Sequence, residues 1–106
     1  MKFVITDQAY RQDPKVDPAL VHGIVRANAW LMELMAGKVG TVRKIAVREK
    51  LPERYTRRLL ELAFLAPDIT EAILDGRQPR DMMLEEIMRN GLPMSWVLQH
   101  RILHFS

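Results

Sequence analysis

The chain has 106 residues, 48% of them hydrophobic, with a formal net charge of +3 and no cysteine. This size predicts one domain, and the lack of cysteine excludes disulfides and thiolate zinc sites and fits a reducing compartment such as the cytoplasm. No apolar run approaches the roughly 18 residues of a membrane-spanning helix, and the first five residues are too short for a secretory signal.

Residues 1–16 are predicted to form an N-terminal strand or arm ahead of a helical domain over residues 17–106. Phe3, Val4 and Ile5 favour an extended backbone. Because one short strand cannot form a sheet by itself, this segment must pair with another chain, pack as an arm or stay loose.

The first predicted helix begins at Pro18, because Asp17 can cap it and proline suits the first helical position. It ends before Gly37. Trp30 lies beside the apolar stripe of this helix and is interpreted as a core or interface aromatic. The stripe, which repeats with helical spacing, consists of Leu20, Val21, Ile24, Leu31, Met32 and Met35.

Two short helices joined by a tight turn are predicted next. Thr41 can cap a helix over residues 42–50, Leu51 and Pro52 make the turn, and a further helix follows over residues 53–64. The apolar face of that helix is formed by Tyr55, Leu59 and Leu62.

Three more helices complete the predicted fold. They span residues 67–75, closed by Gly76, then 81–90, with Asp81 as the cap, and finally 94–104. One face of the last helix carries Trp96, Val97, His100 and Leu103. We therefore expect an all-α fold of five or six short helices around a helix-turn-helix, with a short N-terminal strand or arm.

Residues 42–62 carry the pattern of a helix-turn-helix. This motif needs a small residue where its helices cross, which Ala46 supplies, and apolar residues around the turn, which Ile45, Leu51 and Leu59 supply. The second helix of such a motif presents its N-terminal side chains to the major groove of DNA, and arginine reads guanine there. In this register the exposed side chains of the second helix are Glu53, Arg54, Arg57 and Arg58.

Other residues near the motif are placed to contact the DNA backbone. Thr41 and the first backbone amides of the second helix can hold a phosphate. Arg43, Lys44 and Lys50 are placed for further phosphate contacts.

Charge is distributed unevenly along the chain. Residues 42–58 carry seven basic and two acidic side chains, a net of +5, whereas residues 61–86 carry two basic and seven acidic side chains, a net of −5. Such a directed field steers charged partners. We expect the basic block to face DNA and the acidic block to face away from it or toward a basic partner.

Three residues depart from the usual motif. Lys50 stands in the turn where glycine is common, since that position often needs positive φ. Pro52 stands where a capping serine or aspartate is usual, and Thr56 where valine or isoleucine is usual. These departures favour an alternative, a protein-interaction or oligomerisation module that keeps the helix-turn-helix shape without DNA affinity.

The run TVRKIAVREKLPERYTRRLLELAFLAPDITEAILDGRQP, residues 41–79, closely resembles the C-terminal region of large serine recombinases of the resolvase/invertase family. The segments LAFLAPDI and AILDGRQP carry the resemblance. The DNA-binding core of ParB-type partition proteins is similar to the same helices, less closely. Weaker similarity to the recombinases extends to residues 17–20 and 29–31 and to Leu92, Pro93, Trp96, Gln99 and Phe105.

The resemblance implies double-stranded DNA binding by this region, with Arg54 and Tyr55 in the E-R-Y segment of the family and Arg58 at an arginine of its pattern. The nucleophilic serine, the arginine cluster and the cysteine-bearing zinc ribbon of the family belong to domains that match no part of this sequence. We therefore expect no enzyme activity, no catalytic residue and no cofactor. We expect a free-standing or excised recombinase-like module, associated with the nucleoid, that is a homo-oligomer or part of a larger parent recombinase.

Other candidate sites are weaker. His100 and His104 have the i, i+4 spacing of zinc ligands but no evident third ligand, so no metal site is expected. Ser95 and Ser106 belong to no recognisable nucleophile motif. A partner-binding face, an alternative to core packing, could be formed by Met82, Met83, Leu84, Ile87 and Met88.

Overall fold

The computed structural model describes residues 15–105, and the helices of this part of the chain confirm the expected all-α fold. Residues 1–14 of the strand or arm predicted over residues 1–16 lie outside the described residues, whereas Val16 is described and is buried in the core. Six α-helices and one 3-10 helix, η1, are present in the described residues: α2 (Pro18–Met35), α3 (Val42–Glu49), α4 (Glu53–Leu60), η1 (Glu61–Phe64), α5 (Pro67–Leu74), α6 (Leu84–Asn90) and α7 (Trp96–Ile102).

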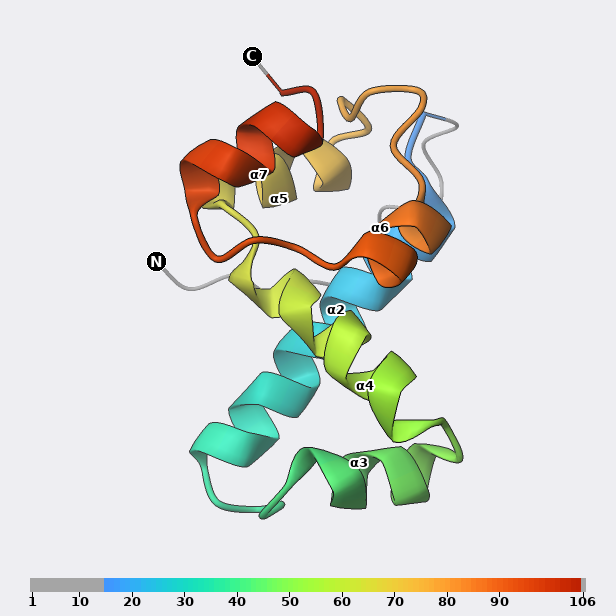
Figure 1. Cartoon of the computed structure of the whole chain (residues 1–106), viewed down its shortest axis with the longest axis vertical. Helices are drawn as coiled ribbons and strands as arrows, with labels where there is room; N and C mark the ends of the chain where they lie inside the picture. The colour runs from blue at the N-terminus through green and yellow to red at the C-terminus, as the bar shows by residue number, and fades with distance from the viewer. Residues whose placement is uncertain (1–14, 106) are drawn as a thin grey trace.

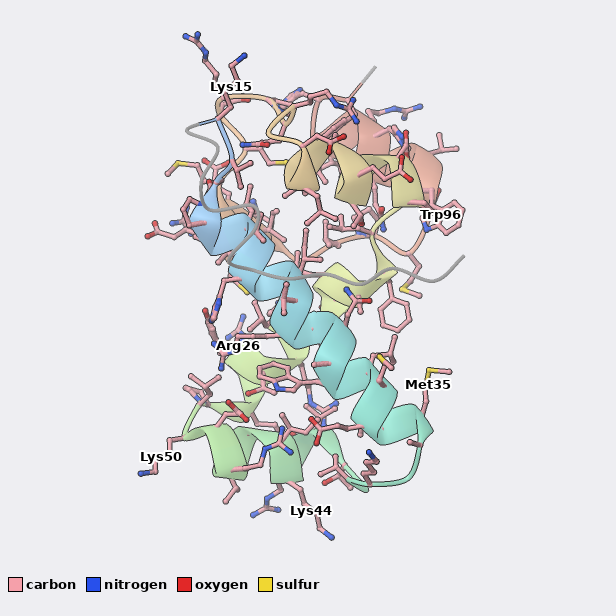
Figure 2. The ribbon with its side chains drawn as sticks, turned by 180° about the vertical axis from the view of Figure 1, so that it is seen from behind. Lys15, Arg26, Met35, Lys44, Lys50 and Trp96 are labelled. Atoms are coloured by element: carbon pink, nitrogen blue, oxygen red, sulfur yellow. The ribbon has the colours of Figure 1, made fainter. Side chains whose placement is uncertain are left out.

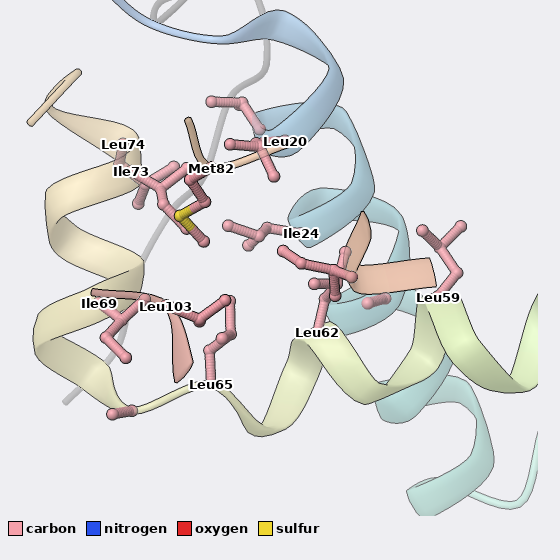
Figure 3. Packing of buried hydrophobic residues seen from close by; sticks show 14 of the residues in the cluster. Leu20, Ile24, Leu59, Leu62, Leu65, Ile69, Ile73, Leu74, Met82 and Leu103 are labelled. Atoms are coloured by element: carbon pink, nitrogen blue, oxygen red, sulfur yellow. The ribbon is translucent and has the colours of Figure 1, made fainter. Parts of the chain in front are cut away.

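Helix α2 runs through the middle of the molecule, with α3 at one of its ends and α5 and α7 at the other (Figure 1). The core forms where α2 meets α4, η1 and α5, and it also takes up Met82 and Leu103 from outside these helices (Figure 3). Gly23 makes the close approach possible, since a Cβ there would lie 2.9 Å from Cδ1 of Leu62. The helices therefore pack around a small residue in the middle of α2.

The buried face of α2 differs from the predicted stripe in its C-terminal half. Met32 and Met35 are 71% and 79% exposed, whereas Ala27 and Trp30 are buried. The side of α2 that packs on the core carries Ile24, Ala27 and Trp30. A pattern of large apolar residues does not reveal this side, because alanine is small. The expected positions of Met32 and Met35 were therefore wrong, and the interpretation of Trp30 as a core aromatic is confirmed.

Two predicted N-terminal caps are confirmed. The Asp17 carboxylate accepts the N–H groups of Ala19 and Leu20 at 2.9 and 3.3 Å, and the Thr41 hydroxyl accepts that of Lys44 at 3.2 Å. These bonds satisfy backbone donors that have no partner within their own helix.

Two predicted helix boundaries were wrong. Asp81 does not cap a helix, because residues 79–82 form a turn that buries Met82 in the core, and α6 begins only at Leu84. The last helix is shorter than residues 94–104 and begins at Trp96, where Ser95 caps it by accepting the N–H of Leu98 at 3.3 Å.

Of the four residues expected along the last helix, only Leu103 is buried, and His100 is half-buried. Trp96 and Val97 are 53% and 69% exposed, while Gln99 is fully buried. Its carboxamide oxygen accepts the N–H of Ala66 at 2.8 Å, and its nitrogen donates to the carbonyls of Phe64 at 3.1 Å and Pro93 at 2.8 Å. A satisfied polar group can take a core position, so Gln99 and not Trp96 faces the interior.

Candidate nucleic-acid interface

Helices α3 and α4 pack together as the predicted helix-turn-helix. Ile45 and Ala46 of α3 are buried, as is Leu59 of α4, and Leu51 of the turn is half-buried. Leu51 donates its N–H to the carbonyl of Ala46 at 2.9 Å, which closes the end of α3. The small and apolar residues therefore occupy the positions that the motif requires.

Lys50 adopts the left-handed conformation, with φ of 59° and ψ of 43°. Glycine is common in this turn because it adopts this geometry without strain. Any other residue there loses roughly 1–2 kcal/mol of conformational free energy. The N–H of Lys50 donates to the carbonyl of Val47 at 3.2 Å. The departure from glycine thus changes the stability of the turn and leaves its shape intact.

The departures at Pro52 and Thr56 are linked. Pro52 precedes α4 without a side-chain capping bond. Thr56 is fully buried at a position where valine or isoleucine is usual, and its hydroxyl donates to the carbonyl of Pro52 at 3.0 Å. Thr56 therefore fills an apolar position while its polar atom keeps a partner.

Three of the seven basic side chains over residues 42–58 are held by carboxylates. Arg57 pairs with Glu53 at 2.9 Å, one turn away on α4. Arg48 pairs with Glu33 of α2 at 2.6 Å and with Glu49 at 3.0 Å. The hydrogen bond from Arg48 lowers the pKa of the Glu33 carboxyl, so this contact between α2 and α3 is charged.

The third held cation is Arg58, which the sequence placed among the exposed residues. It is only half-exposed, because its guanidinium lies over the backbone of Gly91, and it is 3.7 Å from the Glu61 carboxylate. Tyr55 is also half-buried. Arg58 therefore lies against the protein at the edge of α4 and is only partly open to solvent.

The other four cations of the block have no ion pair with a carboxylate of residues 15–105. All four are exposed. Figure 2 shows Lys44 and Lys50 pointing away from the body of the molecule at its α3 end. This group, called here the α3–α4 cations, consists of Arg43, Lys44, Lys50 and Arg54.

The hydroxyl of Thr41, expected near a phosphate, already caps α3 through the N–H of Lys44. Both ends of that bond are exposed, as is Glu53 at the start of α4. Every residue singled out from the sequence for contact with DNA lies on α3, on α4 or next to an end of α3.

Much of the acidic block lies far from the α3–α4 cations. Asp68, Glu71 and Asp75 belong to α5 or follow it directly, and α5 is at the opposite end of α2 from α3 (Figure 1). Asp68 accepts from Nε2 of His100 at 2.6 Å, and Nδ1 of His100 lies 2.6 Å from the carbonyl of Trp96. These three carboxylates are therefore separated in space from the α3–α4 cations, whereas Glu61 of the same acidic block lies beside Arg58.

Little in the structure resembles a metal centre or a membrane span. Among the described residues, no group of three histidine, cysteine or acidic side chains is placed to hold a metal ion. None of the helices described is both long and apolar enough to cross a membrane. The proposed methionine face is divided, since Met82 and Ile87 are buried while Met83 is 54% exposed.

Two surface features were missed by the sequence reasoning. Arg89 of α6 lies in the same groove as Arg54 and Arg58, which no local pattern indicates. A second groove of about 520 Å³ has an apolar wall in which Phe64, Met94 and Trp96 meet. The unusual exposure of these three side chains depends on packing, so the sequence carried no signal for it.

No family model, curated protein or solved structure matches the chain.

Proposed function

We propose that the chain binds double-stranded DNA through its helix-turn-helix, with α4 in the major groove, and that it is not an enzyme by itself. The observation that carries the proposal is the group of four α3–α4 cations, which are exposed and have no carboxylate partner among residues 15–105. Cations of this kind neutralise phosphates and release the counterions that surround DNA.

The ion pair between Arg57 and Glu53 suggests where sequence would be read. Both side chains are exposed on α4, and they are held together at 2.9 Å. Arginine can donate to guanine, and glutamate can accept from cytosine N4. On DNA this pair would separate or bridge neighbouring bases, whereas Arg43, Lys44 and Lys50 would contact phosphates.

The resemblance of residues 41–79 to serine recombinases supports the same function and suggests a recombinase-like, resolvase-related module associated with the nucleoid. One module of this kind buries only about 600–1,000 Å² on DNA. Useful sequence specificity therefore needs a second copy or a larger parent protein. We propose a homo-oligomer or a parent recombinase as the context in which the module acts.

A salt titration of binding to duplex DNA tests the proposal. Four phosphate contacts predict that log affinity falls with log salt concentration with a slope of about −3 to −4. The folded state of the protein is checked by circular dichroism in the same buffers. Absence of binding at about 50 mM salt by the folded protein would overturn the proposal.

Single alanine variants of Arg54 and Arg57 then separate the kinds of contact. Loss of a base-reading arginine costs about 1–3 kcal/mol and relaxes specificity at one position, whereas loss of a phosphate contact weakens all sequences alike. If neither variant changes binding, α4 is not the helix that enters the groove.

One observation favours the alternative function, a protein-interaction or oligomerisation module. Phe64, Met94 and Trp96 are 40%, 73% and 53% exposed, and they meet at one groove. Exposed apolar groups that gather in this way mark interaction surfaces. Sedimentation of the wild type and of Trp96→Asp tests oligomerisation through this groove. A homo-oligomer built on the groove should dissociate in the variant, and a monomeric wild type would contradict the homo-oligomer.

A further inference from the structure

We propose that a shallow groove between α4 and α6 binds a phosphate of the DNA backbone, with Arg89 as a contact outside the helix-turn-helix. The inference rests on the proposed DNA binding and adds a site to it. The groove has a volume of about 320 Å³. It is lined by Pro52, Arg54, Tyr55, Arg58, Met88 and Arg89.

The charge of the groove points to an anion. Three of its lining residues are arginines and none is acidic. Arg54 and Arg89 are exposed and have no ion pair with a carboxylate of the described residues. Guanidinium groups present their donors in a planar fork that matches the oxygens of a phosphate.

The guanidinium of Arg58 lies between Gly91 and Glu61. Gly91 has a φ of 77°, and a Cβ on that residue would collide with the Arg58 guanidinium. On the other side, Glu61 is fixed by accepting the N–H of Leu92 at 2.8 Å, and its second oxygen lies 3.7 Å from Arg58. Arg58 thus adds a third guanidinium to the wall of the groove, with its charge partly balanced by Glu61.

The remaining walls fit a sugar-phosphate chain better than an isolated ion. Pro52, the Tyr55 ring and Met88 give apolar surface beside the guanidinium groups, which suits a deoxyribose next to its phosphate. Pro52 directly precedes α4. A groove at this end of the helix lies where the DNA backbone flanks a helix that has entered the major groove.

The position of Arg89 depends on tertiary packing. Arg89 belongs to the last turn of α6, and α6 packs on α4. The side chain is 35 positions from Arg54 in sequence and nevertheless lines the same groove. The contact surface for DNA therefore extends from the helix-turn-helix onto the helix behind it.

The test measures binding of the full chain to a fluorescent mixed-sequence duplex of about 20 base pairs, two helical turns, between about 50 and 200 mM salt. Arg89→Ala is expected to weaken binding to all sequences alike, roughly threefold or more at the higher salt, and to reduce the slope of the salt dependence by about one. Arg89→Lys keeps the charge and is expected to retain most of the slope.

Arg101→Ala is the matched control, because it removes the same charge from an exposed position on α7, at the other end of α2 from α3 (Figure 1). If the wild type binds and Arg89→Ala and Arg101→Ala have equal salt slopes, the proposed phosphate site in the groove is overturned and the proposed DNA binding is not. A wild type that does not bind overturns the proposed function instead. An effect of Arg89→Ala on one base sequence only would mean base reading and would also overturn the phosphate site.

A double variant strengthens the test. If Arg54 and Arg89 hold the same phosphate, the loss of affinity in Arg54→Ala with Arg89→Ala is smaller than the sum of the two single losses, because residues that share a partner are not additive. Strict additivity would show that the two arginines bind separate groups and would contradict a shared site. Thermal unfolding of each variant establishes that the binding measurements refer to folded protein.

Discussion

The guanidinium of Arg48 donates two hydrogen bonds to the carboxylate of Glu33, from Nη1 at 2.6 Å and from Nη2 at 3.0 Å. Its Nε donates a third to Glu49 at 3.0 Å. These bonds join the C-terminal half of α2 to α3. Arg48, which the sequence counts among the basic residues of the helix-turn-helix, is therefore held by carboxylates of the protein itself, although it stays exposed. Charge alone is thus a poor guide to which cations are available to a ligand.

Arg48 and Arg43 are expected to behave differently when each is replaced by alanine. Arg43→Ala should reduce the salt slope of DNA binding by about one, because Arg43 has no carboxylate partner among residues 15–105. Arg48→Ala should lower the melting temperature and leave the slope nearly unchanged. Binding isotherms and thermal melts of both variants provide the comparison, and a reversed pattern would contradict the assignment.

Lys50 offers a test that separates backbone strain from charge. Lys50→Gly is expected to raise the free energy of unfolding by about 1 kcal/mol, because a side chain in the left-handed region carries a cost that glycine avoids. Lys50→Ala keeps the Cβ and should remain close to the wild type in stability. Urea unfolding measures both.

Both Lys50 variants lose the same charge, so their DNA affinities should fall together. Unequal affinities would mean that the shape of the turn, which has a φ of 59° at Lys50, contributes to binding. Equal free energies of unfolding for Lys50→Gly and Lys50→Ala would contradict backbone strain at this position.

Gln99 is expected to be the most sensitive polar residue of the core that the structure describes. Gln99→Leu removes three hydrogen bonds and leaves the N–H of Ala66 without its partner, which should lower the free energy of unfolding by about 3 kcal/mol. Chemical denaturation measures the loss. A change within about 0.5 kcal/mol would contradict the structural role, because that is the range of ordinary surface substitutions.

Gln99→Glu is the matched variant for this residue. Its carboxylate can still accept from Ala66 but cannot donate to the carbonyls of Phe64 and Pro93. Protonation restores a donor, so the stability deficit relative to the wild type should shrink as the pH falls. A deficit that does not change with pH would show that volume, and not hydrogen bonding, decides this position.

The contact between His100 and Asp68 predicts a pH dependence of stability. Both ring nitrogens of His100 lie 2.6 Å from acceptors, one on Asp68 and one the carbonyl of Trp96, so only the protonated ring donates to both. The hydrogen bond with Asp68, and then that with Trp96, raises the pKa of His100, and the bond with His100 lowers the pKa of Asp68.

The sign of the effect follows from these directions. The contribution of His100 is complete below its unfolded pKa of about 6.5 and is lost as the pH rises through the raised folded value. The contribution of Asp68 is complete above its unfolded pKa of about 3.9 and is lost as the pH falls through the lowered folded value. The pair therefore stabilises the fold most at mildly acidic pH.

Unfolding midpoints in urea between mildly acidic and mildly alkaline pH measure this contribution. His100→Gln and Asp68→Asn should each flatten the alkaline side of the profile, and the double variant should flatten it no further. A wild-type profile that matches that of His100→Gln would contradict the coupling between α5 and α7.

The sequence by itself determined where α2, α3 and α4 begin. Asp17 and Thr41 mark the beginnings of α2 and α3, and Leu51 and Pro52 mark the turn between α3 and α4. Ala46 identifies the crossing of the two helices. These features follow from neighbouring residues, because capping, turn geometry and helical periodicity act over a few positions along the chain.

Only the tertiary structure decided which side chains remain available at the surface. Glu33 pairs with Arg48 from 15 positions away, and Arg58 lies beside Gly91 at 3.7 Å from Glu61. Packing of α6 on α4 brings Arg89 beside Arg54. Ion pairs and burial depend on distances between segments that are remote in sequence, so a count of charges along the chain predicts a basic surface, and the packed fold selects the cations that form it.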